Sequence, residues 1–133
     1  MNLFVDTSVW SLAFRRDAQA GIPEVDRLRH GLESGEAVFT TGLVLQELLQ
    51  GFAGPTSRGA IVERFTSLPL LSPEREDHIS AAELRNECRR SGVQIGTVDA
   101  LLARLCTRHE LVMLTTDSDF EHMAPVVGLE IWR

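Results

Sequence analysis

Two aspartates stand where strands of a parallel sheet would end. Asp6 comes directly after the apolar run Leu3–Val5, and Asp117 comes shortly after the apolar run Leu111–Leu114. In open α/β sheets, ligands bind beyond the carboxyl ends of the strands. Either aspartate taken alone could simply cap the helix that follows it. Together they indicate a possible site at one edge of a sheet.

Two further acids lie on predicted helices. Glu47 is the only charge in the stretch Leu43–Gln50, which is apolar on most sides and predicts a largely buried helix. This pattern leaves little room for a solvated face, and burial of an unpaired carboxylate is costly. Asp99 lies in the first turn of a helix that Thr97 is expected to cap. A favourable interaction with the helix dipole is the structural alternative for Asp99.

If the predicted strands and helices bring these four carboxylates together, the cluster needs cations. Like charges about 4 Å apart repel by about 4 kcal/mol at an effective dielectric constant of roughly 20. Neither Cys nor His accompanies the four acids, and ligation by oxygen alone suits Mg²⁺ or Mn²⁺. One or two such ions would activate water and stabilise the leaving oxygen of a phosphodiester. The pattern therefore indicates metal-dependent hydrolysis.

The elements that must position these acids alternate along the chain. Strands are predicted at Leu3–Val5, Ala37–Thr40, Leu68–Leu71, Leu111–Leu114 and Gly128–Trp132. Helices are predicted over 9–14, 23–33, 43–50, 55–65, 73–91 and 97–106, with a short helix after Asp117. Strands separated by helices predict an α/β fold with a parallel sheet that is covered on both faces.

The composition is that of an ordinary globular chain, and its length fits a single domain over residues 1–133. No apolar run approaches the roughly 20 residues that cross a bilayer, and no signal segment opens the sequence. We therefore expect a cytoplasmic protein without a membrane partner. Cys88 and Cys106 fall in predicted helices without CxxC spacing, so both are expected to be reduced structural thiols.

The net charge of −6 argues against a generic nucleic-acid binder, unless the acids are concentrated where cations are held. All 13 basic residues are Arg and none is Lys, so any phosphate contact would use a guanidinium. A small set of arginines could make such contacts, either to RNA or to a protein partner. A solvated surface position is at least as good an explanation for each of them. The set is Arg15, Arg16, Arg85, Arg89 and Arg90.

Four segments of the sequence resemble PIN domains of the VapC type. They are Leu3–Trp10, Leu45–Leu48, Thr97–Ala103 and Thr115–Phe120, in the order and at the spacing usual for that family. The resemblance covers essentially the whole chain. It implies a three-layer α/β/α sandwich with a central, mainly parallel sheet. It also implies an endoribonuclease site that uses Mg²⁺ or Mn²⁺.

The resemblance implies roles for individual residues. The acidic quartet that is both catalytic and metal-binding in the family corresponds here to Asp6, Glu47, Asp99 and Asp117, with Asp6 and Asp99 as the expected direct ligands. No quartet position departs from the family pattern, so we expect an active enzyme.

Two further positions, and the partners, also follow from the resemblance. Thr115 matches a hydroxyl that supports the water held by the metal, and Asp119 matches an accessory acid. In similar proteins the toxin of a VapBC-like toxin–antitoxin pair forms a homodimer, and a small antitoxin encoded beside it covers the active site. The expected substrate is RNA.

Other functions with acids at strand ends fit less well. A phosphoacceptor receiver needs a Lys, and the chain has none; a haloacid-dehalogenase-like phosphatase needs a second Asp where Ser8 stands. Two alternatives stay open. The chain could be a non-catalytic partner-binding module with the same fold, or a nuclease that acts on DNA, because the quartet recognises a phosphodiester and says little about the sugar.

Overall fold

The computed structural model describes residues 1–15, 17 and 20–133. Its strands are β1 (Leu3–Val5), β2 (Val38–Thr41), β3 (Leu70–Leu71) and β4 (Val112–Leu114). Its helices are α1 (Thr7–Phe14), α2 (Pro23–Glu33), α3 (Gly42–Gly51), α4 (Pro55–Phe65), α5 (Arg75–Arg90), α6 (Thr97–Arg108) and α7 (Ser118–Val127). Among these helices, none is long and apolar enough to cross a membrane.

The strands form a parallel sheet in the order β3-β2-β1-β4. Leu3 is paired with Val38 on one side and with Val112 on the other, so β1 is an inner strand. All residues of β1 and β4 are buried, as expected for parallel strands that are covered on both faces. Asp6, directly after β1, therefore emerges from the middle of the sheet.

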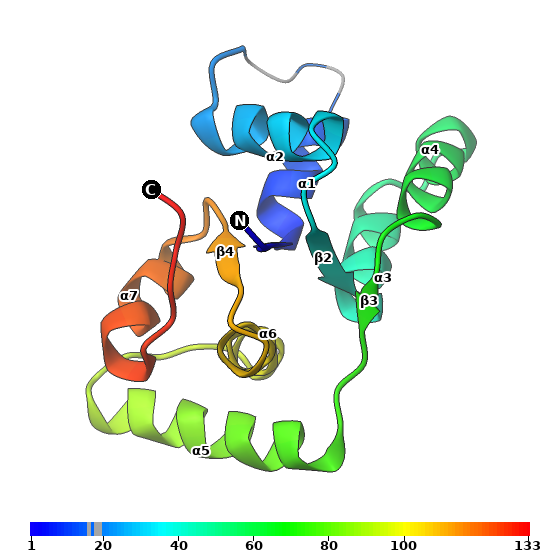
Figure 1. The fold of residues 1–133 in the computed structure, drawn as a ribbon. Coiled ribbons are helices and arrows are strands. Elements are labelled where there is room, and N and C mark those ends of the chain that lie inside the picture. The colour runs from blue at the N-terminus through cyan, green and yellow to red at the C-terminus, as the bar shows by residue number, and fades with distance from the viewer. Residues whose placement is uncertain (16, 18–19) are drawn as a thin grey trace.

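Helices cover both faces of this sheet. Figure 1 shows α1 and α2 on one side and α5 and α6 on the other. Apolar side chains of both layers and of the inner strands join in one core, which includes Phe4, Trp10, Leu102 and Met113. The three-layer α/β/α sandwich predicted from the sequence is thus confirmed.

The predicted last strand, Gly128–Trp132, is wrong as an element. Gly128 has a φ of 72° and forms the C-cap of α7, so the first residue of the segment ends a helix. Beyond it, only an isolated parallel bridge joins Ile131 to Met113. The segment thus lies along β4 without forming a ladder.

Two helix starts also differ from the predictions. Gly96 is the N-cap of α6, and Thr97 is the first helical residue and makes no capping hydrogen bond. The long helix begins at Arg75 rather than Pro73, because the backbone NH of Glu74 donates to Asp77 Oδ2 at 2.8 Å and fixes the first turn there.

Aromatic side chains pack together around Trp10, which is 1% exposed. Trp10 stacks against Phe14 and contacts the ring of Phe65, with centroids 6.0 and 4.9 Å apart. Cys88 and Cys106 are free and buried in α5 and α6, and burial raises the pKa of both thiols. Both cysteines therefore pack as small apolar residues, as expected.

Candidate active site

Asp6 is a buried carboxylate held by neutral donors. It is 3% exposed and forms the N-cap of α1. Its Oδ1 accepts hydrogen bonds from Ser8 Oγ at 2.6 Å, from Ser8 N at 3.1 Å and from Val9 N at 3.4 Å. Its Oδ2 accepts one from Thr115 Oγ1 at 2.8 Å. These bonds fix the orientation of the carboxylate without neutralising its charge.

Burial raises the pKa of Asp6 above its ordinary value. The hydrogen bonds from Ser8, Thr115 and Val9 act in the opposite direction, and the charge of Asp117 raises the pKa further. The sequence left two interpretations of Asp6, a helix cap or part of a site. In the structure Asp6 caps α1 and also lies within the electrostatic reach of Asp117.

Two hydroxyl groups join the ends of β1 and β4. Ser8 Oγ, besides donating to Asp6, accepts a hydrogen bond from the backbone NH of Thr116 at 3.0 Å. Thr115 Oγ1 donates to Asp6 and accepts from the backbone NH of Asp117 at 3.0 Å. The loop after β4 is thereby fastened to the start of α1.

Three carboxylates converge beside this pair of strand ends. Carboxylate oxygens of Asp99, Asp117 and Asp119 all lie within 4.8 Å of one another. Asp99 comes from the first turn of α6, whereas Asp117 is the N-cap of α7 and accepts from the NH of Asp119 at 2.9 Å. Asp119, expected only as an accessory acid, is thus one of the three members of the group.

The electrostatics of Asp99 show how far the negative charge extends. Its pKa is raised to about 6, first by burial and then by the charges of Asp117, Asp119, Glu47 and Asp6. Every sequence-predicted acid therefore contributes to the field at Asp99. Over residues 1–15, 17 and 20–133, none of these acids has a basic group within 4.0 Å.

Glu47 differs from its predicted environment. It is exposed, because Val44 and Leu48 carry the buried side of α3. Its Oε1 accepts a hydrogen bond from Thr7 Oγ1 at 2.8 Å. Glu47 therefore faces the site from α3 with its carboxylate tethered to the first residue of α1.

From the sequence, Ser8 served only to exclude a phosphatase, and Thr7 had no role beyond its place in the segment Leu3–Trp10. The structure gives both a contact with a site acid. The available signal was the run Asp6-Thr7-Ser8, which places two hydroxyls directly after an acid at a strand end. Which acid each hydroxyl reaches depends on the packing of α1 against α3 and β4.

The candidate arginine contacts occupy different surroundings. Arg15 forms a surface ion pair with Asp17, its Nε 3.3 Å from Asp17 Oδ1, and Arg16 lies outside the described residues. Arg85 is half-buried and donates to the carbonyl of Ile95, whereas Arg89 and Arg90 are exposed in the last turn of α5.

Fold and site together define a class of protein: a parallel α/β/α domain that collects acidic side chains beyond the carboxyl ends of neighbouring strands, here β1 and β4. The family profile described as "PIN domain" matches residues 3–125 of this sequence. The chain belongs to the PIN domain family, as the motifs in its sequence indicated.

Named relatives and solved structures agree with this family. Ribonuclease VapC11 of Mycobacterium tuberculosis is 26% identical over 130 residues, which are 96% of each chain. The structure of VapBC-1 from nontypeable Haemophilus influenzae has a TM-score of 0.75 at 18% identity, over 99% of this chain and 97% of that chain. Mycobacterium tuberculosis VapC20, described as a sarcin-ricin loop cleaving toxin, has a TM-score of 0.66 at 22% identity, over 90% and 93%. At these identities the two structures support the fold.

Proposed function

We propose that this protein is a divalent-metal-dependent endoribonuclease that hydrolyses RNA and acts as the toxin of a VapBC-like toxin–antitoxin pair. The family and the names of the curated relatives support ribonuclease activity. The observation that carries the proposal is the convergence of Asp99, Asp117 and Asp119 within 4.8 Å, beside the buried Asp6. Such an arrangement repels itself unless a cation binds.

The donor set fits a hard divalent cation. Asp6, Glu47, Asp99 and Asp117 are the carboxylates that we expect to hold it, and Asp119 lies within reach of Asp99 and Asp117. All of these ligands are carboxylate oxygens, which suit Mg²⁺ or Mn²⁺ better than metals that prefer sulfur or imidazole. When bound, such an ion supplies a Lewis acid that polarises the phosphate and lowers the pKa of water.

The protein's own side chains hold the site carboxylates in place and set their orientation. Thr115 and Ser8 hold the Asp6 carboxylate in one orientation through neutral hydrogen bonds, so its full charge stays directed into the site. The raised pKa of Asp99 shows that its carboxylate sits in a negative field that a cation would relieve. In-line attack of water on an RNA phosphate, without a covalent intermediate, is the reaction that suits this group.

The same resemblance supports proposals about partners. We expect a homodimer, and a cognate small antitoxin that covers the acidic site and so inhibits it. We also expect the pair to act in the cytoplasm, where an RNA substrate is available. The molecular mass in solution of the chain alone tests the homodimer. The molecular mass of the chain co-expressed with the protein encoded beside it tests the antitoxin complex.

The test of the function is RNA cleavage by the purified, antitoxin-free protein. A broad pool of cellular RNA is incubated with Mg²⁺ or Mn²⁺, and in parallel with EDTA. Cleavage that requires the metal and is lost in Asp99→Asn supports the proposal. Asp26→Asn is the matched control, because Asp26 is an exposed acid on α2 that pairs only with Arg29 at the surface. Its cleavage should equal that of the parent.

Two outcomes would replace the proposal by the alternatives. Cleavage of matched DNA but not RNA oligonucleotides would make the protein a nuclease that acts on DNA. Absence of any cleavage would favour the non-catalytic binding module, provided that Mn²⁺ also fails to raise the unfolding temperature of the parent relative to Asp99→Asn. That second readout reports metal binding independently of activity.

A further inference from the structure

A polar cavity of about 360 Å³ opens at residues that are separate from the acidic site. It lies between the C-terminal half of α5 and the segment that leads into α6. Its walls are formed by Arg85, Arg89, Val93, Gln94 and Ile95. Two guanidinium groups and one amide thus face a space that no carboxylate lines.

The two arginines are arranged to receive an anion. They lie four residues apart on α5 and therefore on the same face of the helix. Arg85 Nε donates to the carbonyl of Ile95 at 2.9 Å, which orients its guanidinium in the cavity wall. Within the part of the chain that the structure describes, neither Arg85 nor Arg89 has a carboxylate within 4.0 Å. Their positive charges are not neutralised by those acids.

The cavity adjoins the carboxylate group. Ile95, which forms its wall, is followed by Gly96, the N-cap of α6. A Cβ atom at Gly96 would stand 4.0 Å from Asp99 Oδ2, so the backbone there touches the acid. Because consecutive Cα atoms are about 3.8 Å apart, the wall at Ile95 and the carboxylate of Asp99 are close neighbours.

We propose that this cavity binds a backbone phosphate of the substrate RNA, next to the phosphate that is cleaved. The proposal rests on the proposed ribonuclease function. A strand held at the carboxylates by one phosphate presents its neighbouring phosphates at regular intervals, and a paired guanidinium grips phosphate oxygens well. In a chain of net charge −6, a local positive site is also what attracts a polyanion to an acidic centre.

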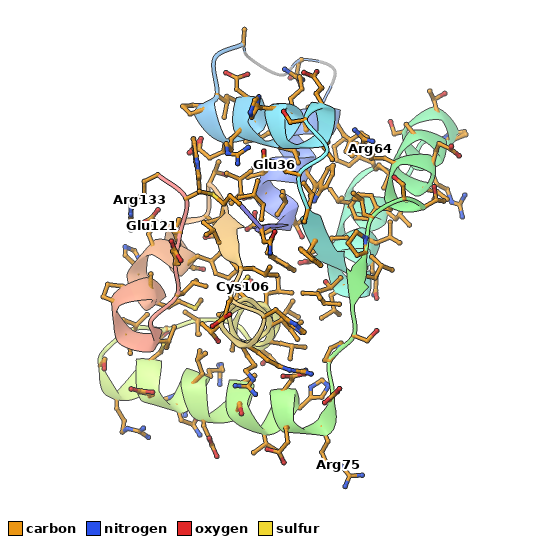
Figure 2. The ribbon with its side chains drawn as sticks, in the orientation of Figure 1. Glu36, Arg64, Arg75, Cys106, Glu121 and Arg133 are labelled. Carbon is orange, nitrogen blue, oxygen red and sulfur yellow. The ribbon has the colours of Figure 1, made fainter. Side chains whose placement is uncertain are left out.

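Arginines at different positions on α5 allow phosphate binding in the cavity to be distinguished from a general effect of positive charge. An arginine in the last turn of a helix also interacts favourably with the helix dipole. This interaction alone could account for the presence of Arg89. Arg75 offers a matched control on the same helix. Figure 2 shows it at the opposite end of α5, pointing away from the protein, and it does not line the cavity. Arg75→Gln changes the net charge by the same amount as the single variant Arg89→Gln but leaves the lining of the cavity intact.

The test compares Arg85→Gln/Arg89→Gln with Arg75→Gln. Steady-state cleavage of one RNA that the parent cuts gives kcat and KM. We expect the double variant to raise KM by about ten-fold or more with kcat unchanged, because the lost contact binds the substrate away from the reacting bond. Arg75→Gln should match the parent. The single variant Arg89→Gln, which leaves the Arg85–Ile95 hydrogen bond in place, should show part of the effect even if the double variant folds poorly.

A binding arm works without catalysis. Each variant is placed in an Asp99→Asn background and titrated with fluorescein-labelled single-stranded RNA of mixed sequence at several salt concentrations. Loss of one phosphate contact should lower the slope of log K against log salt by about 0.7. This arm tests the cavity even if no variant cleaves RNA, so failure of the ribonuclease proposal and failure of this one can be told apart.

Three results would overturn the proposal. One is RNA binding and KM equal to those of the parent in both arginine variants. Another is unchanged RNA binding together with a weaker complex with a co-expressed antitoxin, which would make the cavity a protein contact. An equal loss of RNA binding in Arg75→Gln would likewise show that only overall charge matters.

Discussion

Two buried aspartates of this protein are held in opposite ways. Asp6, at the carboxyl end of β1, is 3% exposed and accepts hydrogen bonds only from neutral groups. Asp77, in the first turn of α5, is fully buried and accepts from the guanidinium groups of Arg104 and Arg108 on α6. Among the described residues, the negative charge of Asp6 has no cationic partner, whereas two arginines neutralise the charge of Asp77.

The pKa directions follow this difference. Burial raises the pKa of both carboxyls, and at Asp6 the neutral hydrogen bonds do not overcome it. At Asp77 the hydrogen bond from Glu74 and the two arginines overcome burial, so its pKa lies below the ordinary value. Asp77 thus completes an ion-pair network within the fold, whereas Asp6 and its neighbours have no such partner among the described residues.

Two acids elsewhere on the molecule are paired with arginine as Asp77 is. Glu36 is gripped by both Nη atoms of Arg27 at 2.7 and 2.8 Å, and its pKa falls to about 2. Glu121 on α7 is paired with Arg133 at the C-terminus, and the two side chains are labelled side by side in Figure 2. Within the described residues, the clustered acids of the candidate site lack such arginine partners, whereas Asp77, Glu36 and Glu121 make structural contacts.

The largest expected effect comes from Asp99→Asn. Because this change removes a proposed metal ligand and one charge from a self-repelling group, we expect RNA cleavage to fall about 100-fold or more. The free energy of unfolding without metal should stay equal or rise, since repulsion is relieved. Cleavage assays and urea unfolding in EDTA measure the two effects. A variant that loses stability together with activity would show that Asp99 is a structural acid like Asp77.

The opposite response is expected from Asp77→Asn. The change leaves Arg104 and Arg108 without their buried partner and weakens the start of α5, so we expect a loss of about 2 kcal/mol in the free energy of unfolding. Both arginines are nearly one-third exposed, which keeps the loss below that of a fully buried pair. Urea unfolding checks the loss, and cleavage by the folded fraction should change little. A stable but inactive Asp77→Asn protein would contradict the comparison.

Much of the fold could be predicted from the apolar pattern. The runs at Leu3–Val5 and Leu111–Leu114 are strands, and the helices between them are present, because parallel strands buried on both faces must be apolar throughout. The strand predicted at Gly128–Trp132 is wrong because Gly128 is the left-handed cap of α7 and the apolar residues after it only pack beside β4. An apolar strand pattern does not reveal such a cap.

The site could be predicted only in part. Acids at strand ends and at helix starts gave the right set of neighbours around Asp99, since chain topology brings those positions to one edge. The exposure of Glu47 and the approach of Asp119 to Asp99 depend on how α3 and α7 are rotated about their axes. The sequence did not reveal the Asp77 network either, because its arginines lie 27 and 31 residues further along the chain.

The pH dependence of stability should separate the two kinds of acid. Asp99 has an ordinary pKa of 3.8 and a folded value of about 6, so the native protein binds a proton between these values and the unfolded chain does not. In EDTA, stability should therefore fall by about 1 kcal/mol as pH rises from about 4 to about 6, after discounting for the exposure of Asp99. Asp6 contributes in the same direction. Asp77, with its lowered pKa, instead loses its contribution as pH falls below about 4.

Urea unfolding across this pH range measures the prediction. Asp99→Asn should lack most of the decrease between about pH 4 and pH 6, and Asp77→Asn should retain it. Addition of Mn²⁺ should cancel the decrease in the parent, because a cation favours the ionised carboxylates. Identical profiles for the parent and Asp99→Asn would place the negative field elsewhere.

The smallest effect is expected from Thr7→Val. The change removes the donor that tethers Glu47 from α1, and we expect cleavage to fall about three-fold with less than about 1 kcal/mol lost in stability, because the bond is exposed. A double-mutant cycle with Glu47→Ala measures the coupling. If Thr7 acts by orienting Glu47, Thr7→Val has no further effect once Glu47 is gone. An equal loss in both backgrounds would mean that Thr7 serves only the start of α1, and Glu47 would then face the acidic group without any side chain to hold it there.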